Sequence, residues 1–210
     1  MTTDKPEVWM IAITGNPISE YYKEHCTPSW TKHGFKVNHF EAKTPKDLET
    51  DECNFLPFTM KHSYSRGVDV EFTQTEKAVW YSHYHAWKKC WDEQTPFIVA
   101  EHDAWLKKDI NPKFYLTNIT CLCHDERIDK EGKLYGRAKL AGGAYYLTPN
   151  AARELMRIRH HKKVIYNSDA WIHRTCDKFG RWNETACMQF KNDEVGVTIE
   201  HNHPGRPFKT

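Results

Sequence analysis

The chain has 210 residues, of which 39% are hydrophobic and 13% aromatic, so it can build the core of one large domain or two small ones. Its formal net charge of +2 is too small to indicate a polyanionic partner by itself. No stretch approaches the roughly 20 apolar residues that cross a bilayer, and the acid near the start of MTTDKPEVWMIAIT argues against a signal peptide. We therefore expect a single cytoplasmic domain over 1–210, with 201–210 as a flexible tail.

The seven cysteines are odd in number and scattered, which in a reducing compartment favours free thiols. Cys121 and Cys123, followed by His124, have some likeness to a zinc-binding pattern. A second pair at zinc-finger spacing is missing from the sequence, so we do not expect a structural zinc site.

The first half of the chain begins with a predicted strand over 8–14, followed by a helix over 18–32 that should break near Pro28. Alternating residues predict a second strand over 35–40, and the polar segment 41–72 is expected to be irregular. Thr73 and Glu76 have the spacing of a capping box, which predicts the start of a helix that continues to about Asp92.

The second half continues the alternation with strands predicted over 97–100 and 142–147. A helix should follow from Thr148–Pro149 to about 159, another over 168–180, and a last strand over 195–200. Alternating strands and helices indicate an α/β fold with a mostly parallel central sheet flanked by helices. In such folds ligands bind at the carboxyl ends of the strands.

The segment PFIVAEHDAWL, residues 96–106, places two acids directly after an apolar run. Side chains alternate along a strand, so Glu101 and Asp103 are expected to point the same way. Two carboxylates at the end of a buried strand are costly without a nearby positive charge, and Mg²⁺ or Mn²⁺ bridging to a phosphate would supply it. The alternative is a solvated turn after the strand.

Three segments together resemble glycosyltransferase family 25. The first, FTQTEKAVWYSHYHAWKKC (72–90), places Glu76, Ser82-His83 and Trp87 as that family does. The second is FIVAEHDAWL (97–106), where the family usually has Glu-Asp-Asp, and the third is GGAYYLTPNAARELM (142–156). Two positions depart from the pattern: His102 replaces the middle acid, and an arginine after the first strand is missing.

The resemblance implies a single GT-A domain with a Rossmann-like sheet. It also implies a nucleotide-sugar donor, with UDP-sugar favoured, a divalent metal, Mn²⁺ or Mg²⁺, and inversion at the transferred sugar. His102 puts the metal geometry in doubt, and the missing arginine puts the nucleotide in doubt. GxGxxG is absent, which argues against a Rossmann dinucleotide site.

Candidate site residues follow from these motifs. Glu101 and Asp103 are the candidate metal ligands, and His201 or His203 could add a third unless the tail is unstructured. Asp169 falls where the family often has an acid and is the candidate base, although it also suits the first turn of a helix. His83 is a catalytic candidate, an ordinary core histidine, or a residue that orients Glu101 or Asp103. The candidates for binding the nucleotide-sugar are Thr14, Gly142, Gly143 and Arg206.

The acceptor is open between an LPS-type saccharide and a hydroxymethylated base in DNA, which would have to be reached or flipped. Basic stretches at 133–139 and 157–163 favour an anionic acceptor, unless they only solvate helix ends. Two other classes remain: a catalytically inactive GT-A-like binding module, and a metal-dependent phosphohydrolase that uses the same carboxylates.

Overall fold

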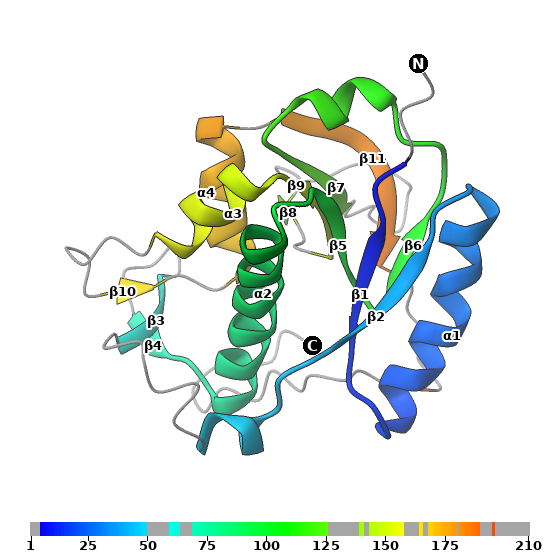
Figure 1. The fold of residues 1–210 in the computed structure, drawn as a ribbon. Helices are drawn as coiled ribbons and strands as arrows, with labels where there is room; N and C mark the ends of the chain where they lie inside the picture. Colours follow the sequence, from blue (N-terminus) through cyan, green and yellow to red (C-terminus); the bar gives the residue numbers. More distant parts are fainter. Residues whose placement is uncertain are drawn as a thin grey trace, which may run out of the picture.

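The computed structural model describes residues 5–49, 59–63, 69–125, 139–140, 143–157, 164–165, 168–179, 181–189 and 195. Within these ranges, eight strands form the main sheet (Figure 1). They are β1 (Val8–Ala12), β2 (Val37–Glu41), β5 (Phe97–Glu101), β6 (Ala104–Leu106), β7 (Ile119–Asp125), β8 (Lys139–Leu140), β9 (Ala144–Leu147) and β11 (Arg181–Gln189).

The main sheet follows the order β2-β1-β5-β9-β7-β11-β6, and β8 pairs with β7. β1 is parallel to β2 and β5, and β7 is parallel to β11, whereas β9 runs antiparallel between β5 and β7. The predicted mostly parallel sheet is therefore confirmed. A smaller sheet has the order β10-β3-β4, made by β3 (Thr59–Ser63), β4 (Asp69–Glu71) and β10 (Val164–Ile165).

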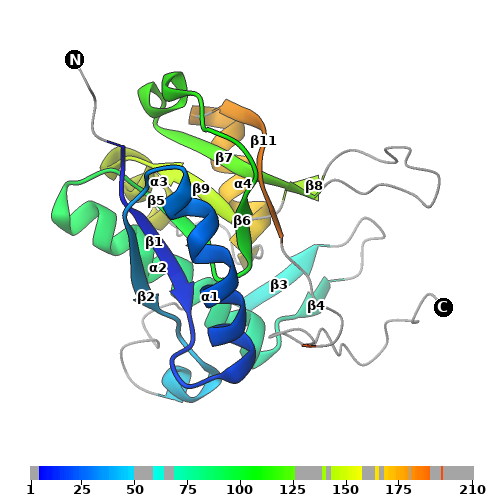
Figure 2. The same cartoon turned by 90° about the vertical axis from the view of Figure 1, so that its right-hand side faces the viewer.

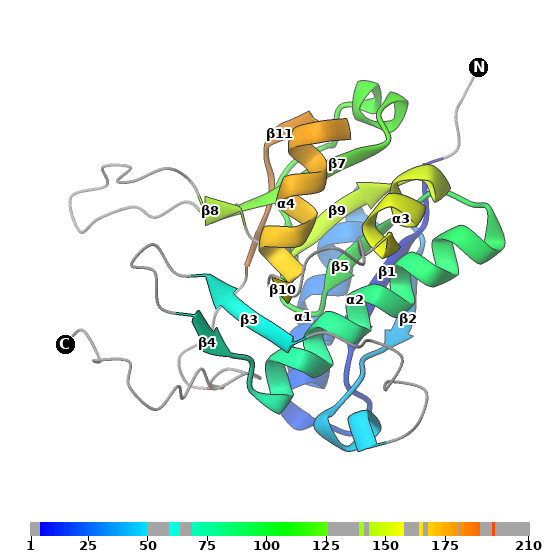
Figure 3. The same cartoon turned by 90° about the vertical axis from the view of Figure 1, so that its left-hand side faces the viewer.

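Helices cover both faces of the main sheet (Figures 2 and 3). On one face lies α1 (Pro17–Lys32), and on the other lie α2 (Gln74–Glu93), α3 (Pro149–Met156) and α4 (Ser168–Phe179). β5 contributes to both resulting cores, with Phe97 and Val99 packed on the α2 side and Ile98 and Ala100 on the α1 side. This alternation carries the next side chain, Glu101, to the α2 side.

The sheet curls strongly at its far edge. Only a two-residue turn joins β5 to β6, although β9, β7 and β11 separate them in the sheet order. β11 reaches β6 because its pairing with β7 shifts register between Trp182 and Cys187, an irregularity that bends a strand. Cys187 then pairs with both Cys123 of β7 and Leu106 of β6.

The predicted break near Pro28 is wrong, because α1 is continuous through that residue. Pro28 is exposed, and so is Glu24, the residue whose carbonyl loses its helical hydrogen bond to the proline. The turn that follows is held by two contacts with β6: Ser29 Oγ accepts a hydrogen bond from Leu106 N at 3.0 Å, and Trp30 Nε1 donates to Ala104 O at 2.8 Å. Tertiary contacts thus stabilise the helix beyond the proline.

The segment 41–72 also differs from its prediction, because it contains a 3₁₀ helix, η1 (Pro45–Glu49), and strands β3 and β4. Polar residues concealed these short strands. A second short helix, η3 (Pro112–Leu116), and the strands β6 and β11 were likewise not predicted. Val195 lies in a turn, and the rest of the strand predicted over 195–200 is outside the described residues. No helix in the described ranges is long and apolar enough to cross a membrane.

Candidate functional site

The carboxyl end of β5 brings together several of the predicted site residues. Glu101 is the last residue of β5, and its backbone N donates to the carbonyl oxygen of Gly143 at 2.7 Å. Gly143 is buried at the start of β9 and therefore lies directly beside Glu101. Two predicted site residues that are 42 positions apart thus meet at one edge of the sheet.

Helix α2 holds two strand ends through consecutive side chains. Its predicted capping box is present, with Thr73 Oγ1 accepting from Glu76 N and Glu76 Oε2 accepting from Thr73 N at 3.0 Å. Ser82 Oγ accepts a hydrogen bond at 2.8 Å from the backbone N of Lys43, just beyond β2. His83, which is 1% exposed, places Nε2 3.2 Å from Glu101 Oε1. The Ser-His pair therefore ties α2 to the ends of β2 and β5.

Asp103 does not continue the strand as predicted, because β5 ends at Glu101 and residues 102–103 form a turn. The argument from strand alternation therefore does not apply to Asp103. Asp103 nevertheless lies only two residues beyond Glu101, so both predicted carboxylates are at the end of β5. Burial raises the pKa of the Cys123 thiol, and the charges of Glu101, Asp103 and Asp169 raise it further. Each of the three predicted acids thus contributes to the pKa of this thiol, by less than burial and Cys121 do.

Asp169 is half-buried in the first turn of α4, as its sequence context predicts. Its charge also raises the pKa of Cys121, after the larger effects of burial and Cys176. α4 packs on β7 and ends at Phe179, just before Arg181 of β11 pairs with Thr120 near the start of β7. The first turn of α4 therefore lies toward the carboxyl end of β7.

His102 lies on the α1 side of this turn. Its ring contacts Tyr22 at a centroid distance of 5.8 Å, and it hydrogen-bonds to the backbone of Ile11. Burial lowers the pKa of His102, although Glu101 and the Ile11 backbone act in the opposite direction. An imidazole that contacts β1 and α1 thus occupies the middle position of the 101–103 motif, where the Glu-Asp-Asp pattern described above has an acid.

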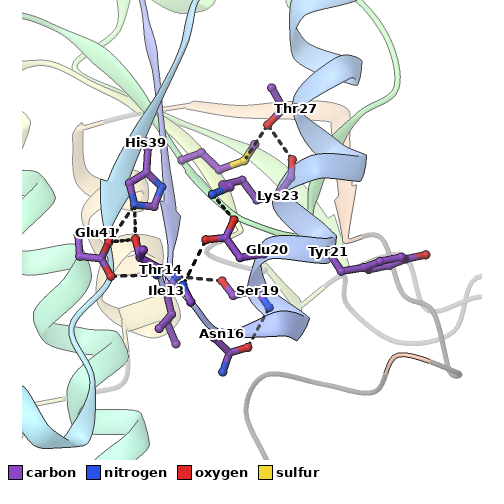
Figure 4. Close-up of polar contacts among 12 residues, drawn as sticks. Ile13, Thr14, Asn16, Ser19, Glu20, Tyr21, Lys23, Thr27, His39 and Glu41 are labelled. Carbon is purple, nitrogen blue, oxygen red and sulfur yellow. Dashed lines mark hydrogen bonds and ion pairs between the residues drawn. The ribbon is translucent and has the colours of Figure 1, made fainter.

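A second polar cluster lies where β1 and β2 end, and Figure 4 shows its side chains. Thr14 N donates to Glu41 Oε1 at 3.0 Å, and Thr14 Oγ1 hydrogen-bonds to Glu41 Oε2. His39 Nε2 lies 2.9 Å from Glu41 Oε2. Burial raises the pKa of Glu41, but the hydrogen bonds from His39 and Thr14 outweigh it and hold that pKa below its usual value. Thr14 was predicted as a site residue from the sequence, whereas its partners Glu41 and His39 were not.

The turn after Thr14 is well defined. Gly15 has φ of +76°, a left-handed conformation that favours glycine. Asn16 caps α1, its Oδ1 accepting from Ile18 N at 3.1 Å and Ser19 N at 3.0 Å (Figure 4). Ser19 Oγ in turn accepts from Ile13 N at 2.9 Å. The end of β1 and the start of α1 are therefore locked together beside Thr14.

The donor atoms present fit a divalent cation only in part. Glu101 and Asp103 offer the carboxylate oxygens that Mg²⁺ and Mn²⁺ prefer. Within the described ranges, no three His, Cys, Asp or Glu side chains are close enough to hold a metal together. A cation here would need oxygens from substrate and water, as Mg²⁺ sites commonly do. Four predicted residues, Gly142, His201, His203 and Arg206, lie outside the described residues.

Two solved structures align with most of the chain. The inositol-1-phosphate CTP transferase from T. maritima aligns with a TM-score of 0.50 and 14% identity over 93% of each chain. A glycosyltransferase involved in the glycosylation of the major capsid of PBCV-1 aligns with a TM-score of 0.45 and 11% identity, over 88% of this chain and 82% of that one. The likeness to the first of these structures, together with the layered α/β architecture, shows a GT-A-like fold.

The sequence places the chain within this class. The model of glycosyltransferase family 25 (LPS biosynthesis protein) matches residues 18–134, which is more than half of the chain. The chain therefore belongs to glycosyltransferase family 25, as its motifs indicated. The match includes Ser82-His83 and Glu101, whereas Gly143 and Asp169 lie beyond it. No curated protein matches the chain.

Proposed function

We propose that this family 25 glycosyltransferase moves a sugar from a nucleotide-sugar, most simply a UDP-sugar, to an acceptor hydroxyl with inversion. The observation that carries the proposal is the carboxyl end of β5, where Glu101 lies beside the backbone of Gly143 and within 3.2 Å of His83. The carboxyl edge of the sheet is where α/β folds bind ligands.

The donor would lie across this edge, with its nucleoside at the ends of β1 and β2. In dinucleotide-binding folds an acid after the second strand binds ribose hydroxyls. Glu41 ends β2, and its hydrogen bonds with Thr14 and His39 orient it and favour its charged form. The donor diphosphate would then lie toward Glu101 and beside the backbone of Gly143.

In the transfer step the bond from the sugar's anomeric carbon to the diphosphate breaks, and the acceptor oxygen bonds to that carbon from the opposite face. Asp169 would accept the proton of the acceptor hydroxyl. A bound Mn²⁺ or Mg²⁺ would act as a Lewis acid and neutralise charge on the departing diphosphate. Glu101 and Asp103 would hold the cation, and His83 would keep Glu101 in place.

The acceptor is proposed to be an LPS-type saccharide, with a hydroxymethylated base in DNA as the alternative. The basic stretches at 133–139 and 157–163 that favour an anionic acceptor lie largely outside the described residues. An acceptor panel with radiolabelled UDP-sugars would separate the two, because only the DNA alternative requires a modified base in the substrate.

A titration calorimetry experiment with UDP and Mn²⁺ tests the site. Asp103→Asn should weaken binding by about 10–100-fold or more, because it removes a charged ligand. Asp169→Asn should bind UDP as the wild type does but lose about 10²–10⁴-fold in transfer, the usual contribution of a general base. Asp109→Asn is the matched control, because Asp109 is exposed and pairs with His33.

If the wild type and Asp103→Asn bind UDP and Mn²⁺ equally well, Asp103 does not hold the metal. If Asp169→Asn transfers sugar as fast as the wild type, Asp169 is not the base. A catalytically inactive binding module is the second candidate, favoured by the lack of three metal-binding side chains in the described part. It predicts UDP binding without transfer or donor hydrolysis across a donor panel. Phosphoester cleavage without a sugar donor would instead indicate a phosphohydrolase.

A further inference from the structure

A buried chain of hydrogen bonds leads from the protein core to Glu101. Trp87 Nε1 lies 2.8 Å from Tyr145 Oη, Tyr145 Oη lies 2.9 Å from His83 Nδ1, and His83 Nε2 lies 3.2 Å from Glu101 Oε1. Trp87 and Tyr145 are wholly buried, whereas the Glu101 side chain is 23% exposed. The chain therefore begins in the core and ends on a carboxylate that solvent and ligands can reach.

The direction of each hydrogen bond follows from the atoms. The indole N–H of Trp87 can only donate, so Tyr145 Oη accepts from it. The hydroxyl hydrogen of Tyr145 needs an acceptor of its own, and among the described residues His83 Nδ1 is the one within reach. Burial raises the pKa of Tyr145 well above its usual value, so the hydroxyl keeps this hydrogen.

The tautomer of His83 is then determined. Because Nδ1 accepts from Tyr145, the ring hydrogen is on Nε2, where it points at Glu101 Oε1. The opposite tautomer would place the Nε2 lone pair against a carboxylate oxygen and leave the buried Tyr145 hydroxyl hydrogen without an acceptor. Both changes are unfavourable in a buried setting.

We propose that Tyr145 and Trp87 are positioning residues, which fix His83 as the Nε2–H donor that holds Glu101 in its binding orientation. The inference rests on the proposed function in one respect, namely that Glu101 serves the donor diphosphate and its cation. In an ordinary core histidine, both ring nitrogens would hydrogen-bond to buried groups. In His83, the second nitrogen, Nε2, contacts the partly exposed carboxylate of Glu101. Residues that hydrogen-bond to metal ligands in this way commonly change the affinity of a site for its metal.

Nitrogen NMR of ¹⁵N-histidine-labelled protein tests the tautomer without any ligand. His83 is assigned by the signal that disappears in His83→Gln. In the wild type, His83 should show a protonated Nε2 and an unprotonated Nδ1. A wild-type spectrum with the hydrogen on Nδ1 overturns the proposal, and this measurement requires no other variant to fold.

Tyr145→Phe tests the positioning role, and Tyr146→Phe is its matched control. Tyr146 is the next residue of β9, is also buried (4% exposed, against 0% for Tyr145), and donates to Tyr115 O at 3.2 Å in the opposite core. Tyr145→Phe should leave His83 as a mixture of tautomers and shift the carboxyl ¹³C resonance of Glu101. Tyr146→Phe should leave both signals unchanged, and equal effects of the two variants would overturn the proposal.

Binding then separates this inference from the proposed function. Tyr145→Phe should weaken Mn²⁺–UDP binding by about 10-fold or more, whereas Tyr146→Phe should stay within about 2-fold of the wild type. If the wild type itself binds no Mn²⁺–UDP, the proposed function fails, while the tautomer and the Glu101 resonance still decide the hydrogen-bond chain. Normal binding by Tyr145→Phe, despite a changed tautomer, would overturn the positioning role alone.

Discussion

His102 shows how one residue can satisfy the fold while departing from the family's acidic motif. Its imidazole is held against Tyr22 and the Ile11 backbone, on the side of the turn that faces α1. The substitution therefore adds a link between β5, β1 and α1 instead of a third acid. Glu101 and Asp103 remain the carboxylates on either side of His102 in the sequence.

This link should make stability depend on pH. Burial lowers the pKa of His102 in the folded state, whereas a histidine in an unfolded chain has a pKa of about 6.5. As the pH falls below that value, the unfolded chain binds a proton that the folded protein does not yet bind, so the free energy of unfolding decreases. The decrease is at most about 1.4 kcal/mol per pH unit and stops once the pH reaches the pKa of His102 in the folded state. Urea unfolding between pH 7.5 and 5.5, with chelator present, should show a smaller slope for His102→Gln. Equal slopes would contradict this account.

Single residues also show what the sequence could and could not predict. The capping box of Thr73 and Glu76 was predictable because both residues belong to one helical turn. The burial of His83 was predictable from helical spacing. Its partners were not, because Glu101 is 18 residues away and Tyr145 is 62, and only the assembled sheet brings them to α2.

Among the elements, the strands with apolar runs, such as β1 and β5, were predictable, whereas β11 was not. Its sequence, RWNETACMQ, is polar through the middle, and its pairing with β7 shifts register before Cys187. A strand that bends to join β6 needs no regular alternation along its length. The curled edge of the sheet followed from that irregular strand and could not be predicted from periodicity.

Helix α1 offers a test of how an element tolerates a local defect. Pro28 removes one backbone hydrogen bond from a continuous helix and is exposed. Pro28→Ala should restore that bond and raise the free energy of unfolding by about 1 kcal/mol or more, since proline in a helix interior costs about 3 kcal/mol relative to alanine. Part of this gain is offset because proline also restricts the unfolded chain.

Thermal unfolding is the measurement, with an expected rise in Tm of about 2–4 °C per kcal/mol for a chain of this size. Glu24→Ala, at an exposed position one turn earlier, is the control and should change stability by less than about 0.5 kcal/mol. A loss of stability in Pro28→Ala would mean that the proline, and not the contacts of Ser29 and Trp30 with β6, sets the course of α1.

At the scale of the whole molecule, free thiols are distributed through both cores. Six cysteines in the described ranges are unpaired with one another and buried, namely Cys26, Cys90, Cys121, Cys123, Cys176 and Cys187. Burial raises the pKa of Cys26 and of Cys90 to about 12, with smaller contributions from Asp103 and Glu93. The predicted free thiols are therefore confirmed for these six, and their geometry indicates packing rather than reactivity.

Thiolate is the reactive form, so these six residues should react with alkylating agents only when the fold opens. In a Cys53→Ala background, mass spectrometry after brief iodoacetamide treatment should find all six unmodified at pH 8, and all six modified in denaturant. Because Cys26 belongs to the α1 core and Cys90 to the α2 core, labelling at intermediate urea reports on each core separately. If the main sheet couples the two cores into one cooperative unit, both thiols become reactive at the same urea concentration. Labelling of Cys26 well before Cys90 would show instead that α1 detaches while the core beneath α2 and the Glu101 site persists.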